Sequence, residues 1–213
     1  MKKFVIFLLS CLLSSFVFAL ETEARISVAY GHGLFFEKGS EQGITAQSNI
    51  VAPGLDISIE AYFNNKNLGL YLNTAYNFPS KLTAKMNNVK VETVRSDYDW
   101  ATVISAILGA AYKYDFGNIS IFGAIGPHFA QTALKTKYVG VLNHSFGIGG
   151  DIGVSYFPIK NFYITGGTLL AYDFFTTGKV NTAYGSANRE GRYSFFSVVP
   201  YIGVGIRYSS SLK

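Results

Sequence analysis

The sequence predicts an all-β chain that folds as an eight-stranded antiparallel up-and-down transmembrane β-barrel, and three observations support this prediction. Eight stretches alternate apolar residues with small or polar ones, and the links between them are alternately long and short. Aromatic residues collect at the ends of these stretches and aliphatic residues in the middle, as the two interfaces of a membrane require. After Ala19, no uninterrupted apolar segment is long enough to cross a membrane as a helix.

The clearest alternation runs from Phe146 to Tyr156. Apolar residues such as Ile148 and Ile152 share one parity, whereas glycine, serine and Asp151 share the other. A period of two gives a strand two different faces. A soluble sheet turns its apolar face inward, and a membrane barrel turns that face toward lipid. The alternative is a soluble β-sandwich, which shares the alternation but has no reason to carry aromatic girdles.

The N-terminus has the features of an export signal. Two lysines precede an apolar run that ends at Phe18, and Ala19 completes a small-residue cleavage site. The run is too short and too often interrupted by serine to be a transmembrane helix. We therefore expect residues 1–19 to be a signal peptide that is removed, and residues 20–213 to form one barrel domain.

The alternative for this segment is a lipoprotein signal with lipidation at Cys11, which follows a small residue. Against it, the apolar core before Cys11 would be very short, and an apolar stretch at Leu12–Leu20 would remain. Cys11 is also the single cysteine of the chain. An exported chain without disulfides must be stabilised by packing or by a membrane.

Charge and aromatic content fit a chain that faces lipid. Charged residues make up 15% and aromatic residues 16%, including 15 tyrosines and 18 phenylalanines. The formal net charge is +5, and removing Lys2 and Lys3 with the signal lowers it by two. Such a mildly basic balance does not indicate a nucleic-acid partner.

Each expected strand carries its own lipid-facing set of alternate residues. The strands, with these residues in parentheses, are expected near 24–36 (Ile26, Val28, Tyr30), 52–63 (Leu55, Ile57, Ile59, Phe63), 68–78 (Leu68, Leu70, Leu72, Tyr76), 98–114 (Trp100, Ile104, Leu108, Tyr112), 119–131 (Ile119, Ile121, Ile125, Phe129), 144–157 (Phe146, Ile148, Ile152, Val154, Tyr156), 161–174 (Phe162, Ile164, Leu170, Tyr172, Phe174) and 193–208 (Phe196, Val198, Ile202, Val204, Ile206, Tyr208).

The links between the strands fix the predicted orientation of the barrel. The short links, which carry turn residues, are 64–67, 115–118 and 158–161. The long links are 37–51, 79–97, 132–143 and 175–192. A barrel with both termini inside the cell envelope needs short periplasmic turns and longer outer loops. The pattern satisfies this requirement with an even number of strands.

Several charged residues fall on the inward parity of the strands. They are Arg25, Asp56, Glu60, Lys113, His128, Asp151, Asp173 and Arg207. A charge inside a narrow barrel must be paired or hydrated. We expect a structural polar network in the lumen, formed by Arg25, Asp56, Glu60, Lys113, Asp151 and Arg207; the alternative is a polar path or gate for a small solute. Side chains normally just fill an eight-stranded interior, so an open pore is not expected.

Two groups of residues near the outer end have side chains that could carry chemistry. His128, Ser145 and Asp173 lie near the outer mouth on three consecutive strands, and these are the residue types of nucleophilic catalysis. The residues around His144 lack the His-x-Ser-Asn order of barrel-type lipid A deacylases, and a solvated rim explains the three equally well. The spacing of His32, His128 and His144 matches no metal site. We therefore expect no catalytic residue, no cofactor and no bound metal.

Pro127 and Pro200 interrupt predicted strands, where each removes a ladder donor. The simpler interpretation is a bulge or a kink. The alternative, implied by a resemblance to OmpW-like barrels, is a lateral gap in the barrel wall that passes apolar solutes, for which an interrupted ladder is the natural place.

The last strand carries the most specific motif of the chain, Tyr201-Ile202-Gly203-Val204-Gly205-Ile206-Arg207-Tyr208. With Gly203, Ile206 and Tyr208, it resembles the insertion signal that outer-membrane proteins present to the barrel-assembly machinery. The whole architecture resembles the small eight-stranded outer-membrane barrels: the OmpA transmembrane domain, OmpX and OmpW. Ser209 to Lys213 extend beyond the aromatic residue at which this family usually ends.

The resemblance implies a location in the bacterial outer membrane, but that family spans adhesins, membrane-tethering proteins, narrow channels and lipid-modifying enzymes. We expect a non-enzymatic monomer in outer-membrane lipid, with a largely plugged lumen, acting through surface loops in cell-surface interaction or envelope integrity. Basic loop residues indicate anionic glycans or host surface ligands as partners, although loop charge can also be merely solvated. These residues are Lys81, Lys85, Lys90, Arg95, Lys135, Lys137, Lys179, Arg189 and Arg192. The alternative functions are a narrow OmpW-like channel for small or apolar solutes and, after it, a lipid-modifying enzyme.

Overall fold

The computed structural model is almost entirely β-strand. It describes residues 22–41, 44–63, 67–86, 89–182, 185–189 and 192–210, so the expected signal peptide at 1–19 and Cys11 lie outside the described residues. The elements are β1 (Thr22–Glu41), β2 (Ile44–Phe63), β3 (Leu68–Asn77), β4 (Lys81–Met86), β5 (Val89–Val94), a 3-10 turn η1 (Arg95–Asp97), β6 (Trp100–Phe116), β7 (Ile119–Lys135), β8 (Val139–Ile159), β9 (Phe162–Thr182), β10 (Gly185–Arg189) and β11 (Arg192–Ser210). Among these residues, no helix is long and apolar enough to cross a membrane.

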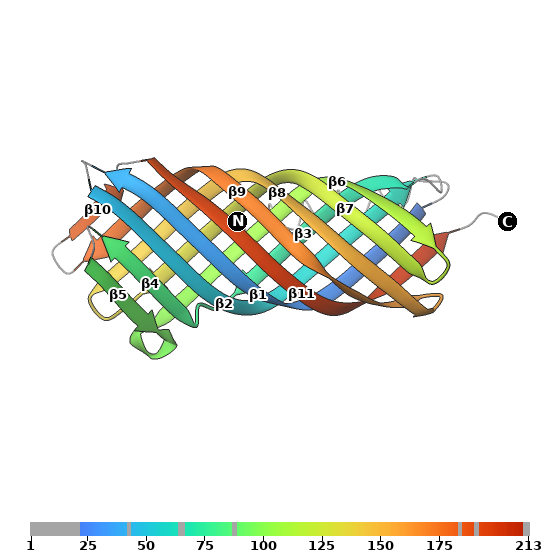
Figure 1. Ribbon diagram of the computed structural model, residues 1–213, viewed down its shortest axis with the longest axis horizontal. Coiled ribbons are helices and arrows are strands. Elements are labelled where there is room, and N and C mark those ends of the chain that lie inside the picture. The colour runs from blue at the N-terminus through green and yellow to red at the C-terminus, as the bar shows by residue number, and fades with distance from the viewer. Residues whose placement is uncertain are drawn as a thin grey trace.

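Eight of the strands form a closed antiparallel ring. The order is β1, β2, β3, β6, β7, β8, β9 and β11, and β11 pairs with β1 to complete it. The β4–β5 hairpin continues along the edge of β2 beyond β3, and β10 folds back on β9. Figure 1 shows the strands winding steeply around a long axis, with β4, β5 and β10 gathered at one end. The ring confirms the predicted eight-stranded up-and-down barrel.

The two ends of the barrel are distinguished by the chain termini. Thr22 lies opposite Ser210 at one end, and the short turns at Gly117-Asn118 and Lys160-Asn161 lie at the same end. Barrels of this class have their short turns in the periplasm. We therefore call this the periplasmic end and the opposite one the outer end. The third predicted turn falls at 64–67, of which residues 64–66 lie outside the described residues.

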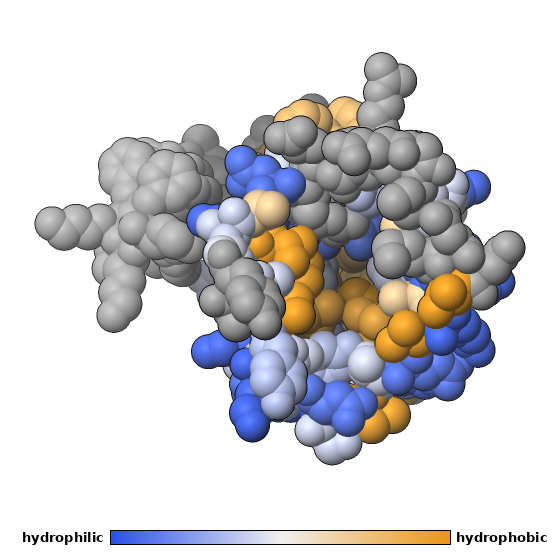
Figure 2. Space-filling view, turned by 90° about the vertical axis from the view of Figure 1, so that its left-hand side faces the viewer, coloured by the Kyte–Doolittle hydropathy of each residue, from blue (hydrophilic) through white to orange (hydrophobic). Residues whose placement is uncertain are grey.

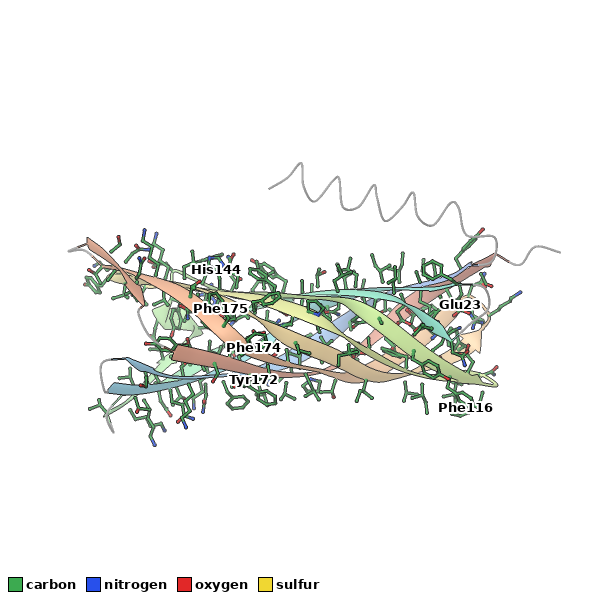
Figure 3. All side chains as sticks on the ribbon, turned by 90° about the horizontal axis from the view of Figure 1, so that it is seen from above. Glu23, Phe116, His144, Tyr172, Phe174 and Phe175 are labelled. Atoms are coloured by element: carbon green, nitrogen blue, oxygen red, sulfur yellow. The ribbon has the colours of Figure 1, made fainter. Side chains whose placement is uncertain are left out.

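The outward face of the ring is apolar, which is the reverse of a soluble sheet. Ile125, Ile152 and Ile202 are 64–65% exposed, whereas Tyr71 and Tyr163, on the inward parity, are 1% exposed. Figure 3 shows Tyr172, Phe174 and Phe175 toward the outer end of the barrel wall and Phe116 at the opposite end. The predicted lipid-facing parity and its aromatic ends are confirmed. The reason for the inversion is that lipid, not water, covers this surface.

One irregularity explains why two consecutive aromatic residues both face outward. The β8–β9 ladder changes register between Phe146 and Gly147, so Phe175 lies opposite Phe146 while Asp173 lies opposite Gly147. Phe174 is the extra residue of this β-bulge. Phe174 and Phe175 are 58% and 60% exposed, and Phe174 meets Phe146 edge to face with ring centroids 6.4 Å apart. The bulge thickens the aromatic girdle at the outer interface.

The expected long outer loops are mostly strand, and that part of the prediction is wrong. The β1–β2 ladder continues as far as Glu41 opposite Ile44, and the stretch 79–97 is the β4–β5 hairpin with η1. A strand of about 20 residues is roughly 68 Å long, and at a tilt of about 40° it spans roughly 50 Å, about twice the apolar band of such barrels. The strands therefore project beyond the lipid. Their polar outer halves concealed the period of two in the sequence.

Pro127 and Pro200 each lie beside a short interruption of one ladder. The β6–β7 ladder skips two pairs at Pro127, and the β1–β11 ladder skips two pairs at Pro200, in both cases without a change of register. Proline has no amide hydrogen to contribute to a ladder. The backbones nevertheless stay in contact at the first site, because a Cβ added at Gly126 would lie 2.2 Å from the carbonyl oxygen of Leu108. The structure therefore shows interrupted ladders at both prolines but no bulge, and this contact speaks against a lateral gap at Pro127.

Candidate functional site

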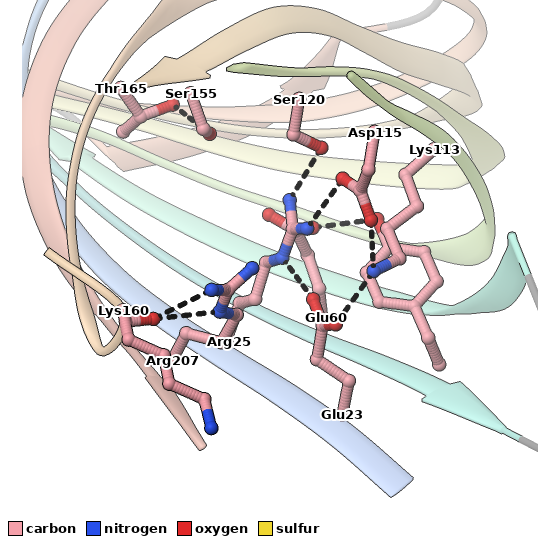
Figure 4. A network of polar contacts seen from close by, with 11 residues as sticks. Glu23, Arg25, Glu60, Lys113, Asp115, Ser120, Ser155, Lys160, Thr165 and Arg207 are labelled. Carbon is pink, nitrogen blue, oxygen red and sulfur yellow. Dashed lines mark hydrogen bonds and ion pairs between the residues drawn. The ribbon is translucent and has the colours of Figure 1, made fainter. Parts of the chain in front are cut away.

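The lumen is filled in layers, and the layer at the periplasmic end is ionic. Arg25, whose side chain is fully buried, contacts Glu23 (Nε–Oε1, 2.6 Å) and Asp115 (Nη2–Oδ1, 3.1 Å). Its Nη1 donates to the hydroxyl of Ser120 at 2.9 Å. Lys113 contacts the same two carboxylates, at 2.7 Å from Glu23 and 2.8 Å from Asp115. Two cations and two carboxylates thus form a closed cycle of ion pairs between β1 and β6 (Figure 4).

An aromatic ring and a third carboxylate complete this layer. The ring of Tyr62 lies 5.4 Å from the guanidinium carbon of Arg25 and 4.7 Å from Nζ of Lys113. The Tyr62 hydroxyl donates to Oε2 of Glu60 at 2.6 Å, and Glu60 is 2% exposed. Cations over an aromatic face gain further electrostatic attraction. The side chains of this layer therefore connect β2 with β1 and β6.

The structure removes Arg207 from the predicted polar network and adds Glu23 and Asp115 to it. Arg207 is not part of the ion-pair cycle: its guanidinium donates to the backbone oxygen of Lys160 at 2.7 and 3.0 Å and lies 4.1 Å from the ring centre of Phe157. Glu23 and Asp115 were missed by the sequence reasoning. The available signal was their spacing, two residues before Arg25 and two after Lys113, which puts each acid on the face of its base.

The middle layer of the lumen is built on Asp151. Tyr71 donates to its Oδ2 at 2.5 Å, and the Tyr201 hydroxyl lies 3.0 Å from both carboxylate oxygens. Gly167 makes room for this tyrosine, because a Cβ there would lie 2.6 Å from the Tyr201 hydroxyl. Asp56 is 2% exposed, and neither of its oxygens has a hydrogen-bond partner in the described protein. The predicted network is thus two separate groups, and Asp56 needs water as its partner.

The layer above Asp151, toward the outer end, is rich in apolar side chains, and the buried His128–Asp173 pair lies at the same level. Phe35 and Phe195 stack with ring centroids 5.8 Å apart, and Val103, Ile107 and Val199 surround them. All five are at most 4% exposed. The sequence reasoning concentrated on the charged inward residues and did not anticipate this apolar cluster, whose members come from strands that are remote in the sequence. Ions do not enter such a layer without their hydration.

The outer mouth above the apolar layer is hollow. A cavity of about 280 Å³ is enclosed by β1, β2, β4, β7, β8, β9 and Tyr98. Figure 2 looks into this end of the barrel, where apolar side chains line the hollow and polar ones surround it. We call this cavity the outer cup. Its apolar wall residues are Ile50, Leu82, Ala84, Leu134, Val139, Val141 and Val180.

The catalytic and metal hypotheses can be compared with the side-chain positions. His128 and Asp173 do form a buried pair (Nδ1–Oδ1, 2.7 Å), but the Ser145 hydroxyl bonds to Thr176 at 3.1 Å, and no bond joins it to His128 within the described residues. His144 lies on the outward face against Phe129, with centroids 6.1 Å apart. It cannot share a metal with the inward His128. No group of three or more potential ligands occurs in the described part of the chain.

The strand expected to carry the insertion signal closes the ring. Ile206 and Tyr208 of β11 face outward, 63% and 70% exposed, and β11 is paired with both β1 and β9. Gly203 lies against β1, since a Cβ there would approach the carbonyl oxygen of Val28 to 2.4 Å. The spaced apolar residues therefore form part of the lipid-facing surface, and glycine allows the closing strands to meet tightly.

Comparison with known proteins gives a fold but no close relative. No family model and no curated protein matches the sequence. Among solved structures, AlkL in lipid bilayers is similar with a TM-score of 0.53, 12% identity, and coverage of 92% of this chain and 95% of that one. Ail, the attachment invasion locus protein of Yersinia pestis, has a TM-score of 0.51, 14% identity, and coverage of 88% and 99%. Neisserial surface protein A has a TM-score of 0.50, 14% identity, and coverage of 87% and 97%.

These identities are low, so the likeness concerns the fold. It agrees with the closed ring, the lipid-facing belt and the aromatic girdles described above. Together they show a membrane-spanning barrel. The chain has the fold of the small eight-stranded outer-membrane β-barrels.

Proposed function

We propose that this barrel is a closed, non-enzymatic surface protein that acts through its outer end, in cell-surface interaction or envelope integrity. The observation that carries the proposal is that the lumen is filled at three successive levels, while the strands continue beyond the lipid belt. The ionic layer, the Asp151 layer and the apolar layer leave no continuous aqueous route. If solutes do not pass through the lumen, the outer end is the surface at which the barrel can meet other molecules.

The outer end carries basic side chains on a firm scaffold. In the β4–β5 hairpin, Glu92 accepts from Lys90 at 2.7 Å and lies 3.8 Å from Lys81. The hydrogen bond from Lys90, followed by the charge of Lys81, lowers the pKa of Glu92 below its ordinary value. One acid is thus shared between two lysines. Lys85 adds a further exposed cation on the same hairpin.

A groove on this hairpin supports anionic glycans or host surface ligands as the partner class. It measures about 340 Å³ and is lined by Gln47, Asn49, Thr83, Lys85 and Lys90. Amide and hydroxyl groups match sugar hydroxyls, and two ammonium groups match sulfate or carboxylate groups. Positive surface potential also accelerates the arrival of polyanions. Exposed recognition residues on a rigid scaffold are the usual arrangement of a binding protein.

The test measures binding of dextran sulfate, with neutral dextran as the control ligand, to the barrel in lipid nanodiscs. We expect Lys85→Gln with Lys90→Gln to weaken dextran sulfate binding by roughly tenfold or more at low salt. Lys160→Gln, at the periplasmic end, is the matched control and should bind normally. Replacing 81–94 by a short turn should leave a folded barrel that binds poorly.

Full binding by the variant with the shortened hairpin would contradict the proposal. Loss of dextran sulfate binding in a folded variant substituted at Asp151 or Tyr201 would also contradict the proposal, because these residues lie inside the lumen. One observation favours a second candidate, the narrow passage for small or apolar solutes: an apolar cluster around Phe35 and Phe195 lies below the outer mouth. Uptake of a labelled apolar solute into proteoliposomes would support this second function.

Three further parts of the proposal are independent of the ligand. The β11 residues Gly203, Ile206 and Tyr208 are proposed to serve as the signal for the barrel-assembly machinery. The barrel is proposed to be a monomer surrounded by outer-membrane lipid. The ion-pair cycle around Arg25 is proposed to be structural rather than a gate, because each of its members has partners within the cycle.

A further inference from the structure

Two buried polar side chains in the middle of the lumen have no hydrogen-bond partner. Asp56 of β2 is 2% exposed, and Asn77 of β3 is fully buried. Both carboxylate oxygens of Asp56, and both Oδ1 and Nδ2 of Asn77, lack a partner within the described residues. Buried polar groups are nearly always hydrogen-bonded, and a buried charge is paired or coordinates a metal ion. These two side chains therefore point to a ligand of the lumen.

A pair of glycines brings the two side chains over one patch of the barrel wall. Gly31 of β1 lies directly opposite Gly54 of β2. A Cβ at Gly31 would lie 2.3 Å from Oδ2 of Asp56, and a Cβ at Gly54 would lie 2.4 Å from Oδ1 of Asn77. Cβ positions of directly opposed residues are about 4.5–5.5 Å apart. The two oxygens thus lie over neighbouring glycines, where one cation with its bound water can contact both. We call this patch the glycine niche.

The charge of Asp56 has no ion-pair partner at this level of the described lumen. The neighbouring Tyr201, which lies opposite Gly31, contacts Asp151, and Asp151 is a second carboxylate. The two buried cations of the periplasmic layer pair with the carboxylates of that layer. On the other side, Val199 packs against the niche, since its Cγ1 would lie 2.9 Å from a Cβ at Gly31. Water can satisfy the hydrogen bonds of such a carboxylate, but it does not neutralise the charge.

We propose that the glycine niche binds one sodium ion, held by the Asp56 carboxylate and the Asn77 amide oxygen and completed by bound water. Oxygen ligands suit hard cations, whereas magnesium keeps more of its water and fits a buried niche less well. One positive charge neutralises one carboxylate, because Asp151 already accepts from the hydroxyls of Tyr71 and Tyr201. A water retained by the ion can accept from the amide nitrogen of Asn77.

Such a site does not need the ligand cluster of a transition metal. The described part of the chain has no group of three or more His, Cys, Asp or Glu residues placed for a metal ion. The sequence-based expectation of no bound metal rested on histidine spacing, which does not address a cation held by one carboxylate, one amide and water. The inference is also independent of the function proposed for the outer end, because the niche lies inside the lumen.

The test measures urea unfolding in bilayers of zwitterionic lipid, followed by the fluorescence of Trp100. The protein is refolded and unfolded in mixtures of sodium chloride and choline chloride at constant total salt, because choline is too large for the niche. A ligand that binds only the folded state stabilises it as the ligand concentration rises. We expect each tenfold rise in sodium concentration above the dissociation constant to lower the unfolding equilibrium constant about tenfold.

Matched variants show whether Asp56 holds the ion. Asp56→Asn keeps the shape of the side chain but removes its charge, so the variant should have the same stability at every sodium concentration. Asp115→Asn, which removes an acid of the periplasmic layer, is the control: it should be less stable but keep the wild-type dependence on sodium. If Asp56→Asn does not fold, Asn77→Leu replaces it and should raise the half-saturating sodium concentration roughly tenfold.

Two results would overturn the proposal. The first is equal stability of the wild type in sodium and in choline at every concentration, which is the result expected if Asp56 is protonated or contacts only water. The second is a dependence on sodium that Asp56→Asn keeps or that Asp115→Asn loses, because the ion would then be bound elsewhere.

Discussion

Different kinds of interaction hold the two ends of one lumen together. At the periplasmic end, Arg25 and Lys113 share Glu23 and Asp115 in a cycle of ion pairs of 2.6 to 3.1 Å. Toward the outer end, the rings of Phe35 and Phe195 pack with aliphatic neighbours, and the buried His128–Asp173 pair is the polar contact at this level.

The difference between the two ends follows from what each must do. The chain ends and short turns meet at the periplasmic end, where directional bonds fix the register of closing strands. Packing between apolar side chains restricts their orientation less than hydrogen bonds and ion pairs do. The cavity of the outer cup lies above this layer. In the proposed function, closure and recognition are divided between the two ends of the barrel.

The largest effect is expected from Arg25→Met. The substitution leaves Glu23 and Asp115 partly unpaired beside the buried Glu60, and removing one partner of a buried pair costs about 3–5 kcal/mol. Urea unfolding in lipid bilayers, followed by the fluorescence of Trp100, the single tryptophan, measures this cost.

Arg207→Met is the matched control for that experiment. Arg207 is only partly buried and donates to one backbone oxygen, so its loss should cost about 1 kcal/mol or less. Equal destabilisation by the two variants would show that the ion-pair cycle contributes no more to stability than the contact of Arg207 with Lys160.

An intermediate effect is expected from Tyr201→Phe in the middle layer. The variant removes one of two hydroxyl donors to Asp151, and a hydrogen bond to a charged group contributes about 1.5–3 kcal/mol. Tyr172→Phe, which faces outward on β9, is the control and should unfold like the wild type. A wild-type midpoint for Tyr201→Phe would show that this layer does not depend on its hydroxyl groups.

The smallest effect is expected from Ile107→Val in the apolar layer. Ile107 is 3% exposed, and removing one buried methylene costs about 0.5–1.5 kcal/mol. The neighbouring Leu108 is 49% exposed toward lipid, so Leu108→Val should cost less. A larger cost for Leu108→Val than for Ile107→Val would contradict the assignment of Ile107 to the packed interior of the barrel.

Most of the fold was predictable, because apolar residues alternate clearly with small or polar ones wherever one face of a strand contacts lipid. Ile125, Ile152 and Ile202 were placed on the lipid side from parity alone, and the structure agrees. The outer halves of β1 and β2 were not predicted, because polar residues on both faces hide the period there. Their pairing with each other is a long ladder that sequence parity does not reveal.

The candidate sites were predictable only in part. The inward position of Asp151 followed from parity, but its partners Tyr71 and Tyr201 come from strands that are remote in the sequence. The outer cup was not predicted, because Glu37 and Asn143 fell in stretches expected to be loops. Contacts across a lumen depend on strand register and tilt, which a single sequence specifies weakly.

Planar-bilayer conductance of the refolded protein distinguishes a closed lumen from an open one. Because three filled layers are proposed to close the lumen, the wild-type barrel should show no stable conductance steps at moderate voltage and salt. Insertion is verified beforehand by heat-modifiable gel migration, since closed barrels resist detergent. Reproducible, long-lived conductance steps from the wild type would contradict the account and make the lumen, not the outer end, the working part of the molecule.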